Sequence, residues 1–238
     1  AQSSPRELCG AAVISAKKSL GQHFLRDPNI TDKIVRLCGD LSALNIIEIG
    51  PGPGALTRSI LAANPLSYTG IEKDERMLQG LHALSTQHTA QSTFLHADAL
   101  KISLPETTPA PRAIIANLPY NVGTEMLVNW LKDIAGTPSS YKFLTLMFQK
   151  EVVDRLVAKP NTKDYGRLSI LTQWLCEAEA LFDLPPSAFS PPPKVVSTVV
   201  KITPRANPEP CTMRALPKFL LRLVLAPRPA RPQSRRRL

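Results

Sequence analysis

Cysteine is scarce in this sequence, and the few cysteines lie far apart. There are four of them, Cys9, Cys38, Cys176 and Cys211, and no two form a Cys-x-x-Cys pair. Disulfide frameworks and structural zinc sites rely on closely spaced cysteines, so we expect neither of them and no metal. Unpaired thiols fit a reducing compartment. We therefore expect a cytoplasmic protein, or one of an organelle matrix if a transit peptide was removed before residue 1.

Long hydrophobic runs are also missing. No apolar stretch approaches the 18 residues that a membrane-spanning helix needs, so we expect no contact with a membrane. Aromatic residues make up only 5% of the chain, but 43% of the residues are hydrophobic, which excludes global disorder. A chain of 238 residues can build one or two domains with a sizeable core.

Acidic residues are almost absent from the end of the chain. The last 54 residues contain 11 Lys and Arg against the single Glu209, together with 12 of the 23 prolines. The preceding residues carry 18 charges of each sign, so the whole net charge of +10 arises after Leu184. A net positive charge suggests a polyanionic partner such as nucleic acid. A basic run is, however, more often a solvated tail than a segment that recognises a specific nucleic acid.

Short apolar runs alternate with amphipathic segments through the neutral part of the chain. We predict strands over 45–49, 68–71, 93–96, 113–116, 143–148, 180–184 and 195–202, and helices over 55–63, 75–84, 125–134, 151–158 and 167–176. This alternation predicts an α/β fold with a mostly parallel sheet. The last two strands have only a proline-rich connection between them, which indicates an antiparallel pair at one edge.

Polar residues and glycines follow the first four predicted strands. Gly50 follows the first strand, Glu72 the second and Asn117 the fourth, and Asp98 lies just past the third. Ligands of an open parallel sheet bind beyond the carboxyl ends of its strands. These four positions therefore predict a binding site.

The glycine loop Gly50-Pro51-Gly52-Pro53-Gly54 differs from the dinucleotide pattern G-x-G-x-x-G and better suits a ligand without phosphates. Glu72 lies 22 residues after Gly50, where a carboxylate grips ribose hydroxyls in sheets of this kind. Asp98 could accept a hydrogen bond from an adenine amino group. Each feature also has a plainer interpretation: a tight turn for the glycines, an exposed charge for Glu72 and an Asx turn for Asp98.

The run Asn117-Leu118-Pro119-Tyr120 carries the most specific signal. Methyl transfer to an exocyclic amine needs the two amine hydrogens to be held so that the lone pair points at the methyl carbon. The Asn117 side-chain oxygen and a backbone carbonyl near Leu118 or Pro119 can accept those hydrogens. Tyr120 supplies a flat surface for a base, and the catalytic gain would come mainly from orientation.

With these motifs the chain resembles the small-subunit ribosomal RNA adenine dimethyltransferase family. The resemblance covers about residues 18 to 202, and it rests on five stretches: 19–25, 48–54, 117–120, 149–169 and 185–195. It implies a Rossmann-like class I methyltransferase fold: a seven-stranded, mostly parallel sheet with helices on both faces. It also implies S-adenosylmethionine as the cofactor.

The resemblance also implies roles for individual residues. The implied cofactor-binding residues are His23, Leu25, Gly50, Glu72, Asp98 and Asn117. The implied catalytic residues are Asn117, Leu118, Tyr120 and Phe189, with Tyr120 and Phe189 against the two faces of the target base. His23 departs from the family, in which Asn is common at this position.

The family's substrate is two adjacent adenosines near the 3′ end of small-subunit rRNA, each of which takes two methyl groups. The expected partner is therefore the small ribosomal subunit rRNA in a pre-30S-like particle, bound by a monomer. A basic helix and loop suits RNA phosphates, although it could also be a solvated helix face. Its basic residues are Lys150, Arg155, Lys159, Lys163 and Arg167.

We expect three parts in the chain: an N-terminal extension over 1–17, the methyltransferase domain over 18–202, and a basic tail over 203–238 that is a remnant of the family's C-terminal helical domain, which is truncated or vestigial here. Two alternative functions share the fold. One is a large-subunit rRNA adenine methylase of the macrolide-resistance type. The other is a non-catalytic ribosome-assembly or mitochondrial transcription factor.

Overall fold

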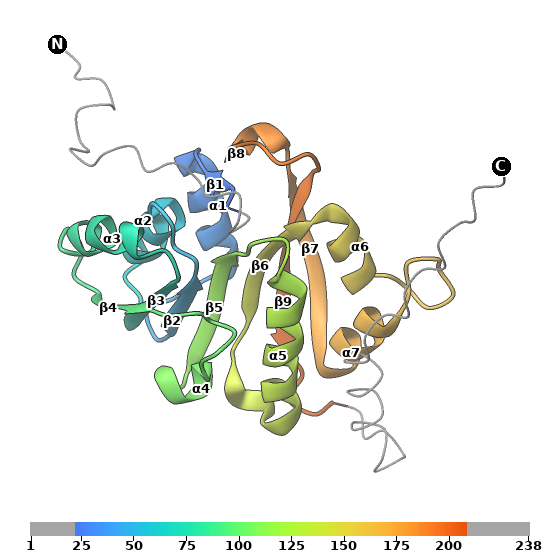
Figure 1. Cartoon of the computed structure of the whole chain (residues 1–238). Helices are drawn as coiled ribbons and strands as arrows, with labels where there is room; N and C mark the ends of the chain where they lie inside the picture. The colour runs from blue at the N-terminus through green and yellow to red at the C-terminus, as the bar shows by residue number, and fades with distance from the viewer. Residues whose placement is uncertain (1–21, 209–238) are drawn as a thin grey trace.

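A seven-stranded sheet forms the centre of the computed structural model, which describes residues 22–208 (Figure 1). The strand order is β4-β3-β2-β5-β6-β9-β7, and only β9 runs antiparallel to its neighbours. This confirms the predicted, mostly parallel sheet and the antiparallel pair at one edge. Its strands are β2 Asn45–Ile49, β3 Ser67–Glu72, β4 Gln91–His96, β5 Arg112–Asn117, β6 Leu144–Gln149, β7 Cys176–Leu184 and β9 Ser197–Pro204.

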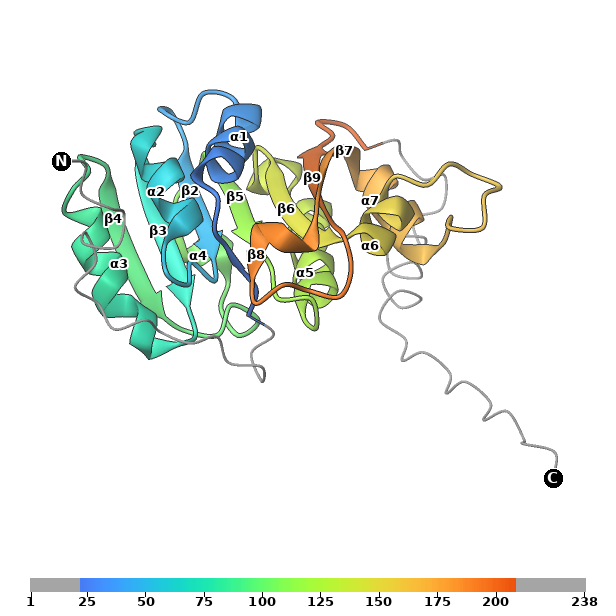
Figure 2. The same ribbon diagram turned by 90° about the horizontal axis from the view of Figure 1, so that it is seen from above.

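Helices cover both faces of this sheet. They are α1 Pro28–Cys38, α2 Ala55–Ala62, α3 Leu78–Ser85, α4 Leu104–Thr107, α5 Gly123–Gly136, α6 Lys150–Leu156 and α7 Arg167–Leu175, with short 3₁₀ turns at Glu75–Met77, Pro138–Ser140 and Pro186–Ala188. Seen from above, α1 lies on one side of the strands and α5 on the other (Figure 2). The five predicted helices are all present, with ends shifted by up to three residues.

Two hydrophobic cores result from this arrangement, one on each face. Ile47 and Ile114 of the central strands point toward the core that contains α5, α6 and α7. Ile46 and Ile115, the residues next to them in the same strands, point toward α1 and α2. Successive residues of a strand face opposite sides, so strands buried on both faces read as continuous apolar runs.

The sequence analysis assigned no element to the segment before residue 45, but two elements lie there. Helix α1 begins at Pro28, and the Asp27 carboxylate accepts a hydrogen bond from the N–H of Asn29. The helix ends before Gly39, whose φ of +89° favours glycine. Strand β1 (Phe24–Leu25) pairs antiparallel with β8 (Phe189–Ser190), which lies in the connection between β7 and β9.

Several expectations concern residues outside the described range. The 1–17 extension, the tail beyond residue 208, Cys9 and Cys211 all lie there. Within residues 22–208 no helix is long and apolar enough to cross a membrane. In the same range, no three His, Cys, Asp or Glu side chains converge as they would around a metal ion.

Candidate active site

The carboxyl ends of the central strands border one pocket. The strand order reverses between β2 and β5, the switch point at which open α/β sheets bind ligands. Seven of the predicted site residues line this pocket: His23, Gly50, Glu72, Asp98, Asn117, Leu118 and Tyr120. Apolar side chains, among them Ile49, Ile71 and Leu100, complete its wall. The residues singled out at four strand ends are therefore brought together in space.

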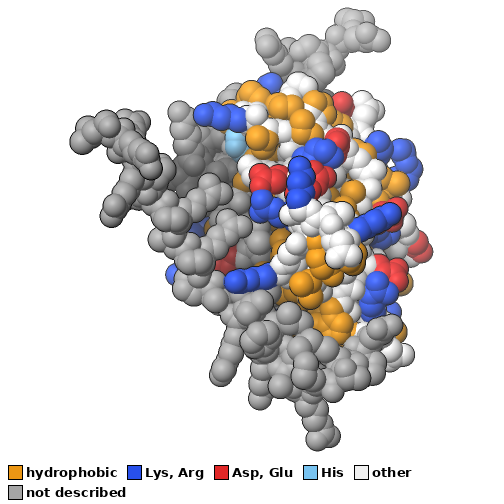
Figure 3. Space-filling view, turned by 90° about the vertical axis from the view of Figure 1, so that its right-hand side faces the viewer, with side chains coloured by type: hydrophobic (Ala, Val, Ile, Leu, Met, Phe, Trp, Pro, Cys, Tyr) orange, Lys and Arg blue, Asp and Glu red, His pale blue; other side chains and the backbone are white. Residues whose placement is uncertain are grey.

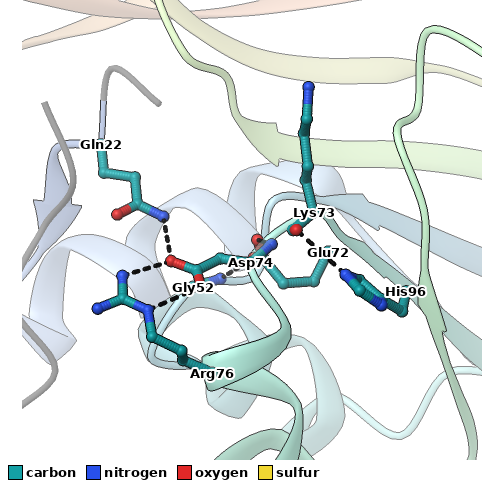
Figure 4. A network of polar contacts seen from close by, with 7 residues as sticks. All are labelled: Gln22, Gly52, Glu72, Lys73, Asp74, Arg76 and His96. Atoms are coloured by element: carbon teal, nitrogen blue, oxygen red, sulfur yellow. Dashed lines mark hydrogen bonds and ion pairs between the residues drawn. The ribbon is translucent and has the colours of Figure 1, made fainter. Parts of the chain in front are cut away.

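The segment Gln22–Leu25, called the roof below, borders the pocket through Gln22, His23 and Phe24. At one end Gln22 donates a hydrogen bond to the buried Asp74 carboxylate, at 3.4 Å (Figure 4). Arg76 holds the same carboxylate with two nitrogens, at 2.8 Å and 2.5 Å. At the other end, β1 pairs with β8. The roof is thus fixed on both sides of the cofactor end of the pocket.

Three contacts of His23 connect this roof to its surroundings, two of them to the Asn117–Tyr120 loop. The Asn117 side-chain nitrogen donates to the His23 backbone carbonyl at 2.8 Å. The His23 Nδ1 donates to the backbone carbonyl of Pro191 at 2.7 Å. The imidazole also stacks on the Tyr120 ring, with the centroids 5.4 Å apart and the planes inclined by 26°. The Tyr120 hydroxyl is in turn hydrogen-bonded to Ser197 at 2.5 Å.

The glycine loop touches the roof from below. Gly52 has a φ of +57°, and a Cβ built on it would lie 2.9 Å from the Phe24 ring. Its N–H donates to the Glu72 carboxylate at 2.9 Å. Only glycine satisfies both the backbone conformation and the close approach of the ring.

The two predicted carboxylates differ in their surroundings. Glu72 is buried, and burial raises its pKa while the N–H groups of Asp74 and Gly52 oppose the rise. The two Glu72 oxygens accept the N–H bonds of Asp74 and Gly52 at 2.8 Å and 2.9 Å, and the Lys73 N–H adds a weaker bond. A carboxylate has about four lone-pair sites, so Glu72 can still accept from a ligand hydroxyl. Asp98 forms an ion pair with the exposed Lys73 at 2.8 Å, which lowers the Asp98 pKa. It also accepts the Leu100 N–H, the Asx turn considered for it above.

Glu48 lies in β2, two residues before the glycine loop, and the sequence predicts no role for its side chain. It is 2% exposed and lines a smaller cavity that shares Phe24, Gly50 and Asn117 with the main pocket. One of its oxygens accepts hydrogen bonds from the Tyr68 hydroxyl at 2.7 Å and from Thr57 at 2.8 Å. Burial raises the pKa of Glu48 to about 7, although these two hydrogen bonds act to lower it.

Two predicted site residues do not line the main pocket. Leu25 is 5% exposed and borders only the smaller cavity. Phe189 is 2% exposed and belongs to the core on the α1 side of the sheet, opposite Leu25 in the β1–β8 pair. In this structure Phe189 is therefore not among the residues that line the main pocket.

The predicted RNA-binding residues lie on α6, on the loop that follows it, and at the start of α7. Lys150 forms ion pairs with Asp154 at 3.5 Å and with Asp183 at 3.2 Å, and Arg155 pairs with Glu151. Figure 3 shows this side of the molecule, where basic and acidic side chains stand next to one another.

The other three predicted RNA-binding residues, Lys159, Lys163 and Arg167, are exposed. Lys159 and Lys163 make no ion pair with any residue in the range 22–208. Ser169 and Gln173 of α7 hold the loop, since Ser169 donates to the Arg155 carbonyl and Gln173 to the Ala158 carbonyl.

Comparison with known proteins agrees with this geometry. The family model for ribosomal RNA adenine dimethylase matches residues 13–225. The chain belongs to this family. It is 49% identical over 203 residues to the ribosomal RNA small subunit methyltransferase A of Rhodospirillum rubrum, covering 85% of this chain and 69% of that relative.

Two solved structures share this fold. A dimethyladenosine transferase from Plasmodium falciparum has a TM-score of 0.68 and 30% identity, over 77% of this chain and 64% of that chain. The 23S rRNA methyltransferase ErmE has a TM-score of 0.67 and 28% identity, over 85% of this chain and 78% of that chain. The expected class I methyltransferase fold is thereby confirmed, and with it S-adenosylmethionine as the cofactor of this dimethylase-family chain.

The acceptor groups of the pocket fit that cofactor. The Glu72 carboxylate suits a pair of ribose hydroxyls, and Asp98 offers an acceptor to an amino group. Gly50 has a positive φ of +66° and lines the pocket. Because it has no side chain, a ligand can approach its backbone directly.

We predict that Gly52→Ala weakens cofactor binding about tenfold, because the new Cβ meets the Phe24 ring and pushes the roof away. The positive φ adds a cost of roughly 1–2 kcal/mol in the free energy of unfolding. Calorimetric titration with S-adenosylmethionine and thermal melting measure the two effects. Gly80→Ala is the matched control, because a Cβ there meets nothing within 4 Å. Equal affinities in the two variants would contradict the packing argument.

We predict that Glu48→Gln changes how stability depends on pH. Between the ordinary carboxyl pKa of 4.5 and the folded value of about 7, Glu48 holds a proton only in the folded state. Raising the pH through this range therefore destabilises the native protein, by about 3 kcal/mol from this group. Glu48→Gln lacks this loss, so its stability relative to the parent should rise by that amount from pH 4.5 to 7. Urea unfolding at several pH values measures it, and Glu75→Gln, at an exposed carboxyl, should show no such change.

Proposed function

We propose that this chain transfers methyl groups from S-adenosylmethionine to the exocyclic amino groups of two adjacent adenosines near the 3′ end of small-subunit rRNA. The observation that carries the proposal is the fixed orientation of Asn117. Its nitrogen is committed to the His23 carbonyl, so its oxygen is the atom that remains for the pocket. A carbonyl-type oxygen at that place accepts a hydrogen from an amine.

The second acceptor is the Leu118 carbonyl. Of the two backbone carbonyls considered in the sequence analysis, that of Pro119 already accepts the N–H groups of Val122 and Gly123, at 3.2 Å and 2.9 Å. These bonds start α5 and fix the turn. With the Asn117 oxygen and the Leu118 carbonyl each holding one amine hydrogen, the nitrogen lone pair is oriented without a strong base.

The chemistry that the cofactor supplies is an electrophilic methyl group. In our proposal Glu72 holds its ribose, Asp98 its adenine amino group and Gly50 its methionine part. We place His23 and Leu25 at the cofactor entrance and propose that Asn117 also contributes to cofactor binding. Because Lys73 pairs with Asp98, the adenine amino group must share or replace that ion pair.

For the target base we propose stacking on Tyr120. Phe189 remains a prediction for the opposite face, since its ring would have to turn out of the core to reach a base. For RNA we propose Lys159, Lys163 and Arg167 as phosphate contacts, with Lys159 and Lys163 as the main ones. Lys150 and Arg155 contribute less, because their charges are compensated by acidic side chains.

The small-subunit substrate is favoured over the large-subunit alternative. Identity is 49% to the small subunit methyltransferase A of R. rubrum and 28% to the 23S rRNA methyltransferase ErmE. The complete Asn117–Tyr120 loop also argues against a chain that has lost its chemistry. We further propose a monomer that acts in the cytoplasm on a pre-30S-like particle. The division into 1–17, 18–202 and 203–238 remains a prediction.

The test of this function is a methyl-transfer assay on small ribosomal subunits and on naked rRNA, read as the mass of the released nucleosides. We expect dimethyladenosine at two adjacent positions. Asn117→Ala should lower kcat by at least tenfold and leave cofactor affinity within threefold, because it removes an orienting acceptor. Glu72→Ala should instead weaken cofactor binding first.

Cofactor binding without any dimethyladenosine on either substrate would favour the non-catalytic alternative. Wild-type behaviour of both variants would overturn the residue assignments.

The RNA contacts have a separate test. We expect the double variant Lys159→Gln and Lys163→Gln to bind rRNA more weakly and to lower the salt dependence, the slope of log K against log salt, by roughly 1.5. The control removes two lysines outside this helix and loop, Lys132 in α5 and Lys142 just before β6, and should keep the wild-type slope. Equal slopes in the two double variants would place the RNA elsewhere.

A further inference from the structure

His23, which is expected at the cofactor entrance, also contacts the two residues proposed to hold the target adenine, Asn117 and Tyr120. Its backbone carbonyl fixes the Asn117 amide, and its ring covers one face of Tyr120. Its Nδ1 reaches the Pro191 carbonyl, which lies 168 residues away in the sequence. A single residue thus touches both groups assigned to the target adenine.

These contacts restrain the imidazole from two directions. The bond from Asn117 holds the His23 backbone, and the bond to Pro191 holds the ring. Tyr120 is restrained as well, because its hydroxyl bonds to Ser197, which is fully buried at the start of β9. The two rings therefore stack between fixed ends, and a base can use only the face of Tyr120 that His23 leaves open.

From this arrangement we propose that His23 is a positioning residue for the target base: its imidazole backs the Tyr120 ring and sets the plane on which the adenine stacks. The inference rests on the proposed function, since it assigns Tyr120 to the target base. It goes beyond the cofactor role expected for His23. It also gives a physical role to the imidazole itself, since an asparagine, the residue common in the family at this position, has no ring to stack.

Two substitutions separate the ring from the hydrogen bond. His23→Phe keeps a ring that can stack and loses the donor to Pro191. His23→Asn keeps a donor and loses the ring. Aromatic stacking contributes about 0.5–1.5 kcal/mol, which corresponds to a change of roughly 2- to 12-fold in a rate. His88→Asn is the control, because His88 lies in the turn after α3, away from the pocket.

We expect His23→Asn to lower kcat on the RNA substrate about 3- to 10-fold and His23→Phe to keep it within threefold. The affinity for S-adenosylmethionine, measured by calorimetry, should stay within twofold for His23→Asn. In a Tyr120→Leu background, His23→Asn should change kcat by less than twofold, because residues that act through one contact are not additive.

Two results would overturn the proposal. In one, His23→Asn lowers kcat by the same factor with and without Tyr120, or weakens the cofactor affinity instead; His23 then acts on the cofactor alone. In the other, kcat does not change in any His23 variant.

A spectroscopic readout separates failure of this proposal from failure of the proposed function. Fluorotyrosine labelling gives one ¹⁹F signal for each of the four tyrosines, and the Tyr120 signal is the one that Tyr120→Leu removes. If the wild type methylates no RNA, the function fails, but the signal still reports the stack. His23→Asn should shift it, and His23→Phe and His88→Asn should shift it much less. An unchanged signal in His23→Asn overturns the stacking role.

Discussion

The hydrogen bond from the Asn117 amide to the His23 carbonyl is the contact on which the site depends. It joins the end of a central strand to a roof segment 94 residues away in the sequence. Without it, the amide could turn its nitrogen toward the pocket and present a donor where an acceptor is needed. The same contact places the imidazole beside Tyr120, so that cofactor roof and target loop form one unit.

Much of this site is predictable because it obeys local rules. A buried parallel strand appears as a continuous apolar run, and the first polar residue or glycine after it marks the carboxyl end of the strand. For this reason Gly50, Glu72 and Asn117 could be named before any coordinates were known. Helix α1 was missed although its signals were present, with Asp27-Pro28 at the start and Gly39 at the end.

Other features depend on contacts that no local pattern reveals. The β1–β8 pair joins two residues on each side, which is too short for a periodic signal. The burial of Phe189 follows from that pair. Likewise, one of the two ion pairs of Lys150 is with Asp183 of β7, which is far away in the sequence, so the basic character of Lys150 in the sequence overstates its availability for RNA. For the same reason, the net charge of the chain does not indicate where RNA binds, because it does not show which charges lack an acidic partner.

The short β1–β8 pair has a consequence for biosynthesis. The roof of the pocket is made by residues near the beginning of the described chain, but it is held by Ser190 and Pro191 near its end. Contacts between such distant segments form late, because the intervening chain must first be ordered. A nascent chain therefore carries the whole glycine loop long before it carries a closed site. An unfinished chain stalled before Pro191 would leave the target loop without the contact that restrains the His23 ring, so competence for methyl transfer is acquired only when nearly the whole sheet has been made.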